Sequence, residues 1–134
     1  LELFPDVTGL RGTEDVEPTA AMQHIAKYAK WLADALMGID IDVQFKKAPK
    51  QAGSGWLARY NEGAKMMAFN VQLLGTSWFK SKITAEHTSL IIHELAHEGE
   101  SKSHHQGEYV HRLADLGAQA THLALTSGRT EWFK

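Results

Sequence analysis

The first part of the chain carries apolar residues with helical spacing. They recur at intervals of three and four, which is the period of one face of an α-helix: Met22, Ile25, Ala29, Leu32, Ala33 and Leu36. Pro18 suits the first position of a helix and Gly38 the residue after its last turn, so the pattern predicts a helix from residue 18 to about residue 37. Residues 1–17 contain two glycines, one proline and five acidic residues. We expect them to form an irregular arm or the remnant of a linker.

Three segments in the middle of the chain have strand patterns. Residues 39–45 alternate between apolar and polar side chains, as a half-buried strand does. Residues 56–60 and residues 65–74 are the second and third predicted strands. The segment between them predicts a hairpin turn in which Gly63 takes a positive φ. We expect a small three-stranded sheet that is mostly antiparallel.

Two helices are predicted in the last third of the chain. Thr84 is a suitable N-cap and Glu86 lies in the first turn, where a negative charge is favoured, so a helix is expected over residues 84–98. After a polar loop, a second amphipathic pattern covers residues 108–126. This order of helix, strands and two helices is typical of an α+β fold. We expect residues 18–134 to form a single domain.

Composition narrows the class of protein. The 134 residues carry a net charge of −2 with histidine neutral, and 43% are hydrophobic against 22% charged. This balance is typical of one globular domain and argues against nucleic acid as a partner. No stretch approaches the ~20 apolar residues of a membrane span, no secretory signal is visible, and the absence of cysteine excludes disulfides and thiolate metal sites. We expect a cytoplasmic domain without membrane contact. Because the sequence begins at Leu1, we also expect it to be part of a longer chain.

The segment His93-Glu94-Leu95-Ala96-His97 is the strongest chemical signal in the sequence. Residues four apart lie on one face of a helix, so both imidazoles can reach one ion at the usual zinc–nitrogen distance of about 2.0–2.1 Å. Glu94 can then take a proton from a water molecule that the ion activates. The flanking residues are apolar, so the helix is expected to be buried. Burying two histidines and a glutamate costs free energy unless these side chains are paired or bind a metal ion. We therefore predict His93 and His97 as zinc ligands and Glu94 as the catalytic base.

A catalytic zinc site needs a third protein ligand and an open position. The candidates all lie downstream: His104, His105, Glu108, His111 and Asp115. The metzincin spacing fails, because it requires a glycine at position 100 and a histidine at position 103, where the chain has Glu100 and Ser103. A carboxylate from the last helix, Glu108 or Asp115, is the gluzincin-like option.

The region of this motif resembles the SprT-like and WLM-type zinc peptidases over about thirty residues. The likeness comprises residues 90–97, a short polar loop, and His105-Gln106-Gly107-Glu108-Tyr109. In those families a histidine four residues before an aromatic residue is the third ligand. The resemblance thus implies that His105 binds zinc and that Tyr109 packs against it, with His104 as the alternative ligand.

The chain lacks one part of the SprT-like proteins and resembles a further family. The cysteine-rich zinc ribbon of SprT-like proteins is missing, and with it their DNA-associated part. The chain is also similar to the metallopeptidase-like domains appended to some GHKL-type ATPases. The likeness to zinc peptidases extends to residues 69–71, which it implies could be an edge strand that aligns an extended substrate.

Three functional hypotheses follow. The first is a zincin-like zinc metallopeptidase acting on a peptide or protein substrate, with the strand at residues 65–74 holding the substrate by β-augmentation. The second is a non-catalytic or weakly active metal-binding regulatory domain of a larger protein, such as one that contains an ATPase. The third is a domain in which zinc only joins the last two helices. Glu94 favours the first, because a structural site does not need that carboxylate.

The remaining tryptophans and histidines have simpler interpretations. We expect Trp31, Trp56 and Trp78 to serve in packing rather than in a ligand cage. His87 lies in the first turn of the predicted metal-binding helix, away from the face that carries His93.

Overall fold

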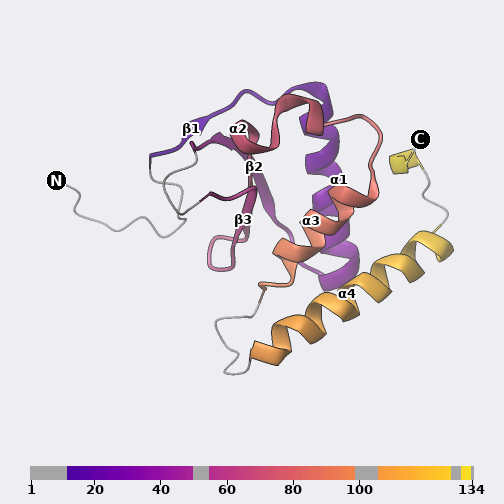
Figure 1. The fold of residues 1–134 in the computed structure, drawn as a ribbon. Coiled ribbons are helices and arrows are strands. Elements are labelled where there is room, and N and C mark those ends of the chain that lie inside the picture. The colour runs from indigo at the N-terminus through magenta and orange to yellow at the C-terminus, as the bar shows by residue number, and fades with distance from the viewer. Residues whose placement is uncertain (1–11, 50–54, 99–105, 128–130, 134) are drawn as a thin grey trace.

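The computed structural model describes residues 12–49, 55–98, 106–127 and 131–133. Helices pack against a small mixed sheet (Figure 1), which confirms the expected α+β class. The elements in chain order are β1 (Glu14–Asp15), α1 (Ala20–Met37), β2 (Asp42–Lys47), β3 (Ala58–Asn61), β4 (Met66–Asn70), α2 (Val71–Leu74), the 3₁₀ helix η1 (Thr76–Trp78), α3 (Ala85–Leu95), α4 (Gln106–Thr126) and the 3₁₀ helix η3 (Glu131–Phe133).

The sheet has four strands in the order β1-β2-β4-β3. The pair β2–β4 is parallel, whereas β1–β2 and β3–β4 are antiparallel. The sheet therefore differs from the expected three mostly antiparallel strands, because it has a fourth strand and a parallel central pair. All five residues of β4 are buried, which suits a central strand. β3 carries the polar side chains of Arg59 and Asn61, which suit an edge strand.

Strand β4 ends at Asn70, four residues before the predicted end of the third strand. The Asn70 side chain is fully buried, and its Oδ1 accepts hydrogen bonds from the main-chain N–H groups of Ala48 at 3.1 Å and Gln72 at 3.2 Å. Its Nδ2 donates to the carbonyl oxygens of Ala48 and Trp56, both at 2.9 Å. The bond to Gln72 caps α2, so the chain turns into a helix instead of extending the strand.

This arrangement corrects the expected substrate-binding strand. β4 is paired with β2 on one side and with β3 on the other. A strand with partners on both edges has no main-chain groups left for a substrate. Residues 65–74 therefore cannot hold a peptide by β-augmentation. Of the strands next to α3, it is β3 that has an edge without a strand partner in the described part of the chain.

Strands β3 and β4 form the predicted hairpin, but the residue with a positive φ in its turn is not the predicted one. Lys65 adopts a φ of 50°, and Gly63 does not have a positive φ. The turn is supported by Asn61, whose Oδ1 accepts the main-chain N–H of Ala64 at 2.7 Å. The left-handed region costs a non-glycine residue roughly 1–2 kcal/mol, so Lys65 occupies this position at a local cost.

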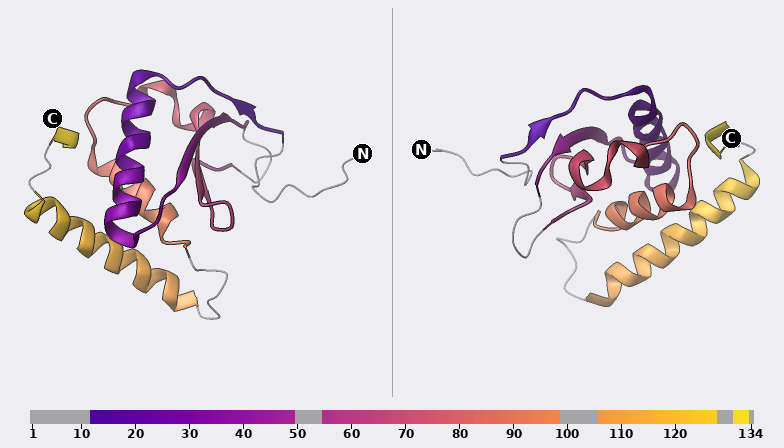
Figure 2. Two further views of the ribbon diagram at one scale, coloured as in Figure 1. Left: turned by 180° about the vertical axis from the view of Figure 1, so that it is seen from behind. Right: turned by 45° about the horizontal axis from the view of Figure 1, so that its top comes forward.

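Helices α1 and α3 lie on the same side of the sheet, and α4 crosses the outside of both (Figure 2). Side chains from these helices and from the covered face of the sheet form the core, which includes Ile25, Leu32, Ile41, Met67, Phe69, Ile91 and Leu95. Trp78 packs against Phe79, and Trp31 packs against Trp132, with ring centroids 5.1 and 5.7 Å apart. These contacts confirm packing roles for Trp31 and Trp78.

The first helix ends where it was predicted to end, but it begins at Ala20, two residues after the predicted start at Pro18. Thr19 is the N-cap of α1, with its side chain accepting the main-chain N–H of Met22 at 3.2 Å. Gly38 ends the helix with a φ of 67°, the left-handed conformation expected of a C-terminal glycine. The predicted apolar face is buried, apart from the partly exposed Leu36.

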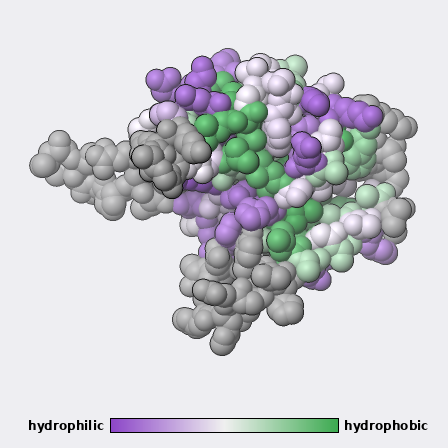
Figure 3. All heavy atoms as spheres, in the orientation of Figure 1, coloured by the Kyte–Doolittle hydropathy of each residue, from purple (hydrophilic) through white to green (hydrophobic). Residues whose placement is uncertain are grey.

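The expected irregular arm contains one short regular element. Glu14 and Asp15 pair with Lys47 and Lys46 as strand β1, and Asp15 forms an ion pair with Lys46. On the face shown in Figure 3, hydrophobic and hydrophilic residues are interspersed. Of the helices that the structure describes, none combines the length and the apolar character that crossing a membrane requires.

Candidate metal centre

Helix α3 carries the predicted motif, and its start is fixed by a reciprocal cap. Thr84 is the N-cap, as predicted, and its Oγ1 accepts the main-chain N–H of His87 at 3.4 Å. In return, the main-chain N–H of Thr84 donates to Nδ1 of His87 at 2.9 Å. The Nε2 of His87 lies 2.6 Å from the carbonyl oxygen of Trp78. His87 is therefore a buried structural residue, in agreement with its predicted place away from the ligand face.

The other end of α3 is tighter than an α-helix. The main-chain N–H of Ala96 donates to Ile92 four residues back, but those of His97 and Glu98 donate only three residues back, to Glu94 and Leu95. Bonds of this second kind belong to a 3₁₀ turn. The regular helix thus ends at Leu95 rather than near Glu98, and His97 lies on the turn that follows.

The structure brings His93, Glu94 and His97 together. Each offers one ligand atom, and these atoms all lie within 4.8 Å of one another. The imidazole rings of His93 and His97 have centroids 5.7 Å apart, and Nε2 of His93 lies 3.8 Å from Oε2 of Glu94. The His93 side chain is 52% exposed and the Glu94 side chain 10%. The group therefore has an accessible imidazole at its surface and a carboxylate held inside.

The predicted third ligand is not among these residues. His104 and His105 lie outside the described residues. Glu108 and His111 fall within α4, in a part of that helix whose side chains are outside the described structure. Asp115 is described, and it does not belong to the group around His93. Its exposed carboxylate accepts a hydrogen bond from Gln119 at 2.7 Å.

A second cluster, which sequence reasoning missed, lies beside the candidate ligands. The carboxylate of Glu98 accepts a hydrogen bond from the phenol of Tyr60 in β3 and forms an ion pair with Lys65 in the hairpin turn. The Glu98 side chain is only 15% exposed. No local pattern could have indicated this cluster, because Tyr60 and Glu98 are 38 residues apart in the chain. The cluster anchors the turn after His97 to the β3–β4 hairpin.

The electrostatic surroundings of Tyr60 keep its phenol protonated. Burial disfavours the charged form, and the negative charge of Glu62 acts in the same direction. Together they raise the pKa of Tyr60 from its ordinary value of 10.0 to about 12. The phenol is therefore a hydrogen-bond donor to Glu98 throughout the neutral range.

Strand β3 is the last strand of the sheet, so one of its edges, next to α3, is open in the sense that no strand of the described part of the chain pairs with it, although Ala58 is only 8% exposed. In an antiparallel pair, the main-chain groups of successive residues point alternately toward the partner strand and away from it. Leu57 accepts the main-chain N–H of Asn70 at 2.8 Å, so Leu57 and Arg59 face β4. Ala58 and Tyr60 therefore direct their N–H and C=O groups to the other edge, with which no strand of the described part of the chain pairs.

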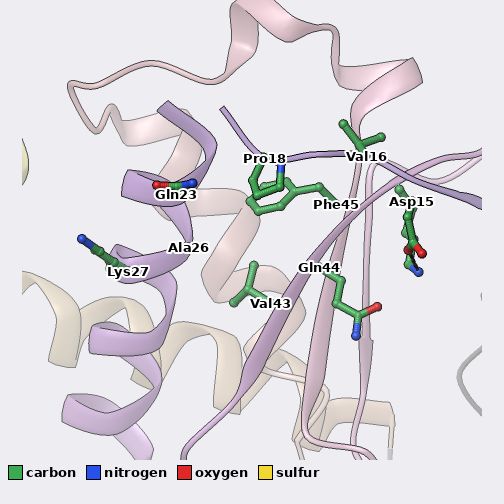
Figure 4. A pocket seen from close by; sticks show the side chains of 10 residues that line it. Asp15, Val16, Pro18, Gln23, Ala26, Lys27, Val43, Gln44 and Phe45 are labelled. Carbon is green, nitrogen blue, oxygen red and sulfur yellow. Dashed lines mark hydrogen bonds and ion pairs between the residues drawn. The ribbon is translucent and has the colours of Figure 1, made fainter. Parts of the chain in front are cut away.

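A cavity of about 630 Å³ lies elsewhere, between α1, β2 and the segment that leads from β1 into α1 (Figure 4). Val43, Phe45 and Pro18 supply apolar surface, and Gln23 and Lys27 lie at its α1 side. None of His93, Glu94 or His97 lines this cavity. It therefore does not serve the candidate metal centre at the end of α3.

Comparisons of the chain with protein-family models, with curated proteins and with solved structures gave no match.

Proposed function

We propose that this domain is a zinc-dependent hydrolase of peptide bonds. The observation that carries the proposal is the convergence of His93, Glu94 and His97, with ligand atoms within 4.8 Å of one another at the end of α3. Imidazole nitrogen and carboxylate oxygen are donors that zinc accepts in proteins. The same residues fit a catalytic role better than a purely structural one, because a structural site is closed by four protein ligands whereas this group is partly exposed.

The residues have separate roles in this proposal. His93 and His97 would hold the ion, which when bound supplies Lewis-acid chemistry by polarising the scissile carbonyl group and making water more acidic. Glu94 is the general base, which takes a proton from the attacking water and passes it to the leaving amine nitrogen. Its low exposure limits competition from bulk water for this carboxylate.

The open edge of β3 is the place for an extended substrate. Ala58 and Tyr60 offer main-chain donors and acceptors there, and a peptide strand can complete the ladder on that side. β3 packs against α3, so a peptide on this edge runs past the helix that carries His93 and Glu94. This edge replaces the strand at residues 65–74 as the proposed substrate-binding strand.

The test separates catalysis from metal binding. Wild type, Glu94→Gln and Glu86→Gln proteins are loaded with zinc and incubated with a degenerate peptide library, and cleavage is followed by mass spectrometry. Glu94→Gln keeps the shape of the side chain but removes the base, so cleavage should fall by ~10²-fold or more while zinc affinity stays the same. Glu86→Gln is the matched control, because Glu86 is an exposed residue at the other end of the same helix.

Two results would contradict the proposal. If the zinc-loaded wild type cleaves no peptide, or if Glu94→Gln cleaves as fast as wild type, the domain is not a peptidase that uses Glu94. Zinc binding without cleavage would favour the metal-binding regulatory domain instead.

A further inference from the structure

We infer that Glu98 is a positioning residue, which holds the turn carrying His97 in place and joins the candidate metal centre to the substrate edge of β3. This inference rests on the proposed function, and it assigns a role to residues outside the His93, Glu94 and His97 group. Glu98 makes no contact with a reacting group in this role. It acts through His97, its neighbour in the chain.

The first argument concerns where the helix loses its regularity. The main-chain N–H groups of His97 and Glu98 bond three residues back, so this turn lacks the full α-helical ladder that supports His93. A ligand on such a turn needs support from elsewhere to keep its geometry. Glu98 is the side chain of that turn that contacts the β3–β4 hairpin.

The second argument is that Glu98 is held from two different elements. Tyr60 donates from β3, and Lys65 donates from the hairpin turn. Hydrogen bonds to a charged group are the stronger kind, and the low exposure of Glu98 limits screening by water. Two donors from separate places fix a carboxylate in direction as well as in distance.

The backbone of Lys65 is a third, independent sign. Its φ of 50° is a conformation that glycine or asparagine adopts at lower cost. Glycine is available in this very turn at position 63, yet a lysine occupies the strained position. Strain of this kind persists only where the surrounding structure holds the residue in place, and it clusters at functional sites; here the lysine side chain is held by Glu98.

The cluster also connects two functions of one strand. Tyr60 directs its main-chain groups to the open edge of β3, while its phenol binds Glu98 next to His97. A peptide strand that pairs with Tyr60 is thereby set at a fixed position relative to the metal ligands. The register of the substrate and the geometry of the centre thus depend on the same contacts.

The main test measures zinc affinity, by competition with a chromophoric chelator, well below the unfolding temperature. Glu98→Ala should bind zinc about 10-fold more weakly than wild type, the usual scale for losing support of a ligand. Tyr60→Phe and Lys65→Met each remove one donor and should have smaller effects. Glu86→Gln is again the control for the loss of one acidic charge from the α3 region.

A double-variant cycle shows whether Glu98 acts through His97. In a His97→Ala background, Glu98→Ala should cause no further loss of zinc affinity, because the residue that it positions is absent. A purely structural role would lower the melting temperature in both backgrounds and leave the zinc affinity of the folded protein unchanged. A further loss in the His97→Ala background would also overturn the inference.

A measurement without metal covers the case of weak binding. In the metal-free protein, Tyr60→Phe removes one hydroxyl and preserves the fold, and it should shift the ring resonances of His97 in ¹H–¹³C spectra more than those of His93. Unchanged His97 resonances, or an unchanged zinc affinity of Glu98→Ala, would overturn the positioning role while leaving the proposed peptidase intact. If wild type binds no zinc at all, the proposed function itself fails, and this inference fails with it.

Discussion

The imidazole of His87 lies with its Nε2 atom 2.6 Å from the carbonyl oxygen of Trp78, the residue that ends η1. Its Nδ1 accepts the main-chain N–H of Thr84, so the proton of the ring belongs on Nε2, where it is donated to Trp78. One side chain thereby satisfies two main-chain groups and caps α3, the helix that carries the candidate metal centre. Its ring also packs edge-on against the Trp78 indole, with centroids 4.4 Å apart.

We predict that His87→Ala lowers the free energy of unfolding by about 2–4 kcal/mol, because it removes a buried ring and leaves main-chain polar groups without partners. Urea denaturation measures this loss. His93→Ala is the matched control on the same helix. It should change stability by less than about 1 kcal/mol, since the side chain is half exposed, and should instead weaken zinc binding. Equal destabilisation by the two variants would contradict the separation of structural and ligand histidines.

Asn70 gives a second test of a buried polar residue. Its side chain makes four hydrogen bonds, three of them to groups of Ala48 and Trp56 on other segments. Asn70→Ala should therefore cost more than about 3 kcal/mol, measured by chemical denaturation. Asn61→Ala is the control with the same chemical change, and it should cost only about 1 kcal/mol, because Asn61 lies at the less buried hairpin. A small effect at Asn70 would show that water replaces these bonds.

The helices were more predictable than the sheet, for a physical reason. The start of α3 at Thr84 and the end of α1 at Gly38 depend on caps, and capping is a local property of a few neighbouring residues. The strand order depends instead on which segment is most apolar on both faces, and on contacts such as that between Asn70 and Ala48. Alternation of apolar and polar residues along the sequence indicates a strand, but it does not indicate which strand lies next to it in the sheet.

The same difference between local and long-range contacts applies to the candidate metal centre. The spacing of His93 and His97 is local, so the sequence alone predicts that their ligand atoms lie near each other, as the structure shows. The contact of Glu98 with Tyr60 and Lys65 exists only after β3 has packed against α3, and it has no signature in the sequence. The third ligand remains a prediction from the resemblance, because His105 lies outside the described residues.

The raised pKa of Tyr60 predicts a loss of stability at high pH. The folded state holds the phenolic proton with a pKa of about 12, above the ordinary 10.0, because of burial and the charge of Glu62. The stabilisation from this group is therefore complete below pH 10 and is lost as the pH rises through about 12. In Tyr60→Phe the free energy of unfolding should depend less steeply on pH in this range. Absorbance of tyrosinate during titration of the native protein should also show a group that ionises near pH 12.

Zinc should stabilise the folded domain by mass action. At a free concentration of about 100 times Kd, the gain in the free energy of unfolding is about 2.7 kcal/mol. This shift should disappear in the His93→Ala, His97→Ala double variant.

His105→Ala should lower zinc affinity by 10-fold or more, while His104→Ala should change it little. The reverse order would move the third ligand to His104, and no loss in either variant would move it to a carboxylate such as Glu108.

Proline substitutions test the open edge of β3. Ala58→Pro removes an N–H group that points away from β4, at the first residue of the strand, where proline is tolerated. It should raise KM for a peptide substrate while zinc affinity changes little. Arg59→Pro removes an N–H group on the β4 side and should destabilise the fold by about 3 kcal/mol. If Ala58→Pro leaves KM unchanged, the substrate does not pair with this edge.

The central place of β4 has a consequence for synthesis on the ribosome. Strands β2 and β3 do not pair with each other, and each meets the sheet only through β4. A nascent chain that stops before Met66 therefore has only the two-residue pairing of β1 with β2. Domains generally fold as units, so the N-terminal elements of this one cannot complete their sheet until a strand from the middle of the sequence has emerged. The residues of the candidate metal centre are made after that strand.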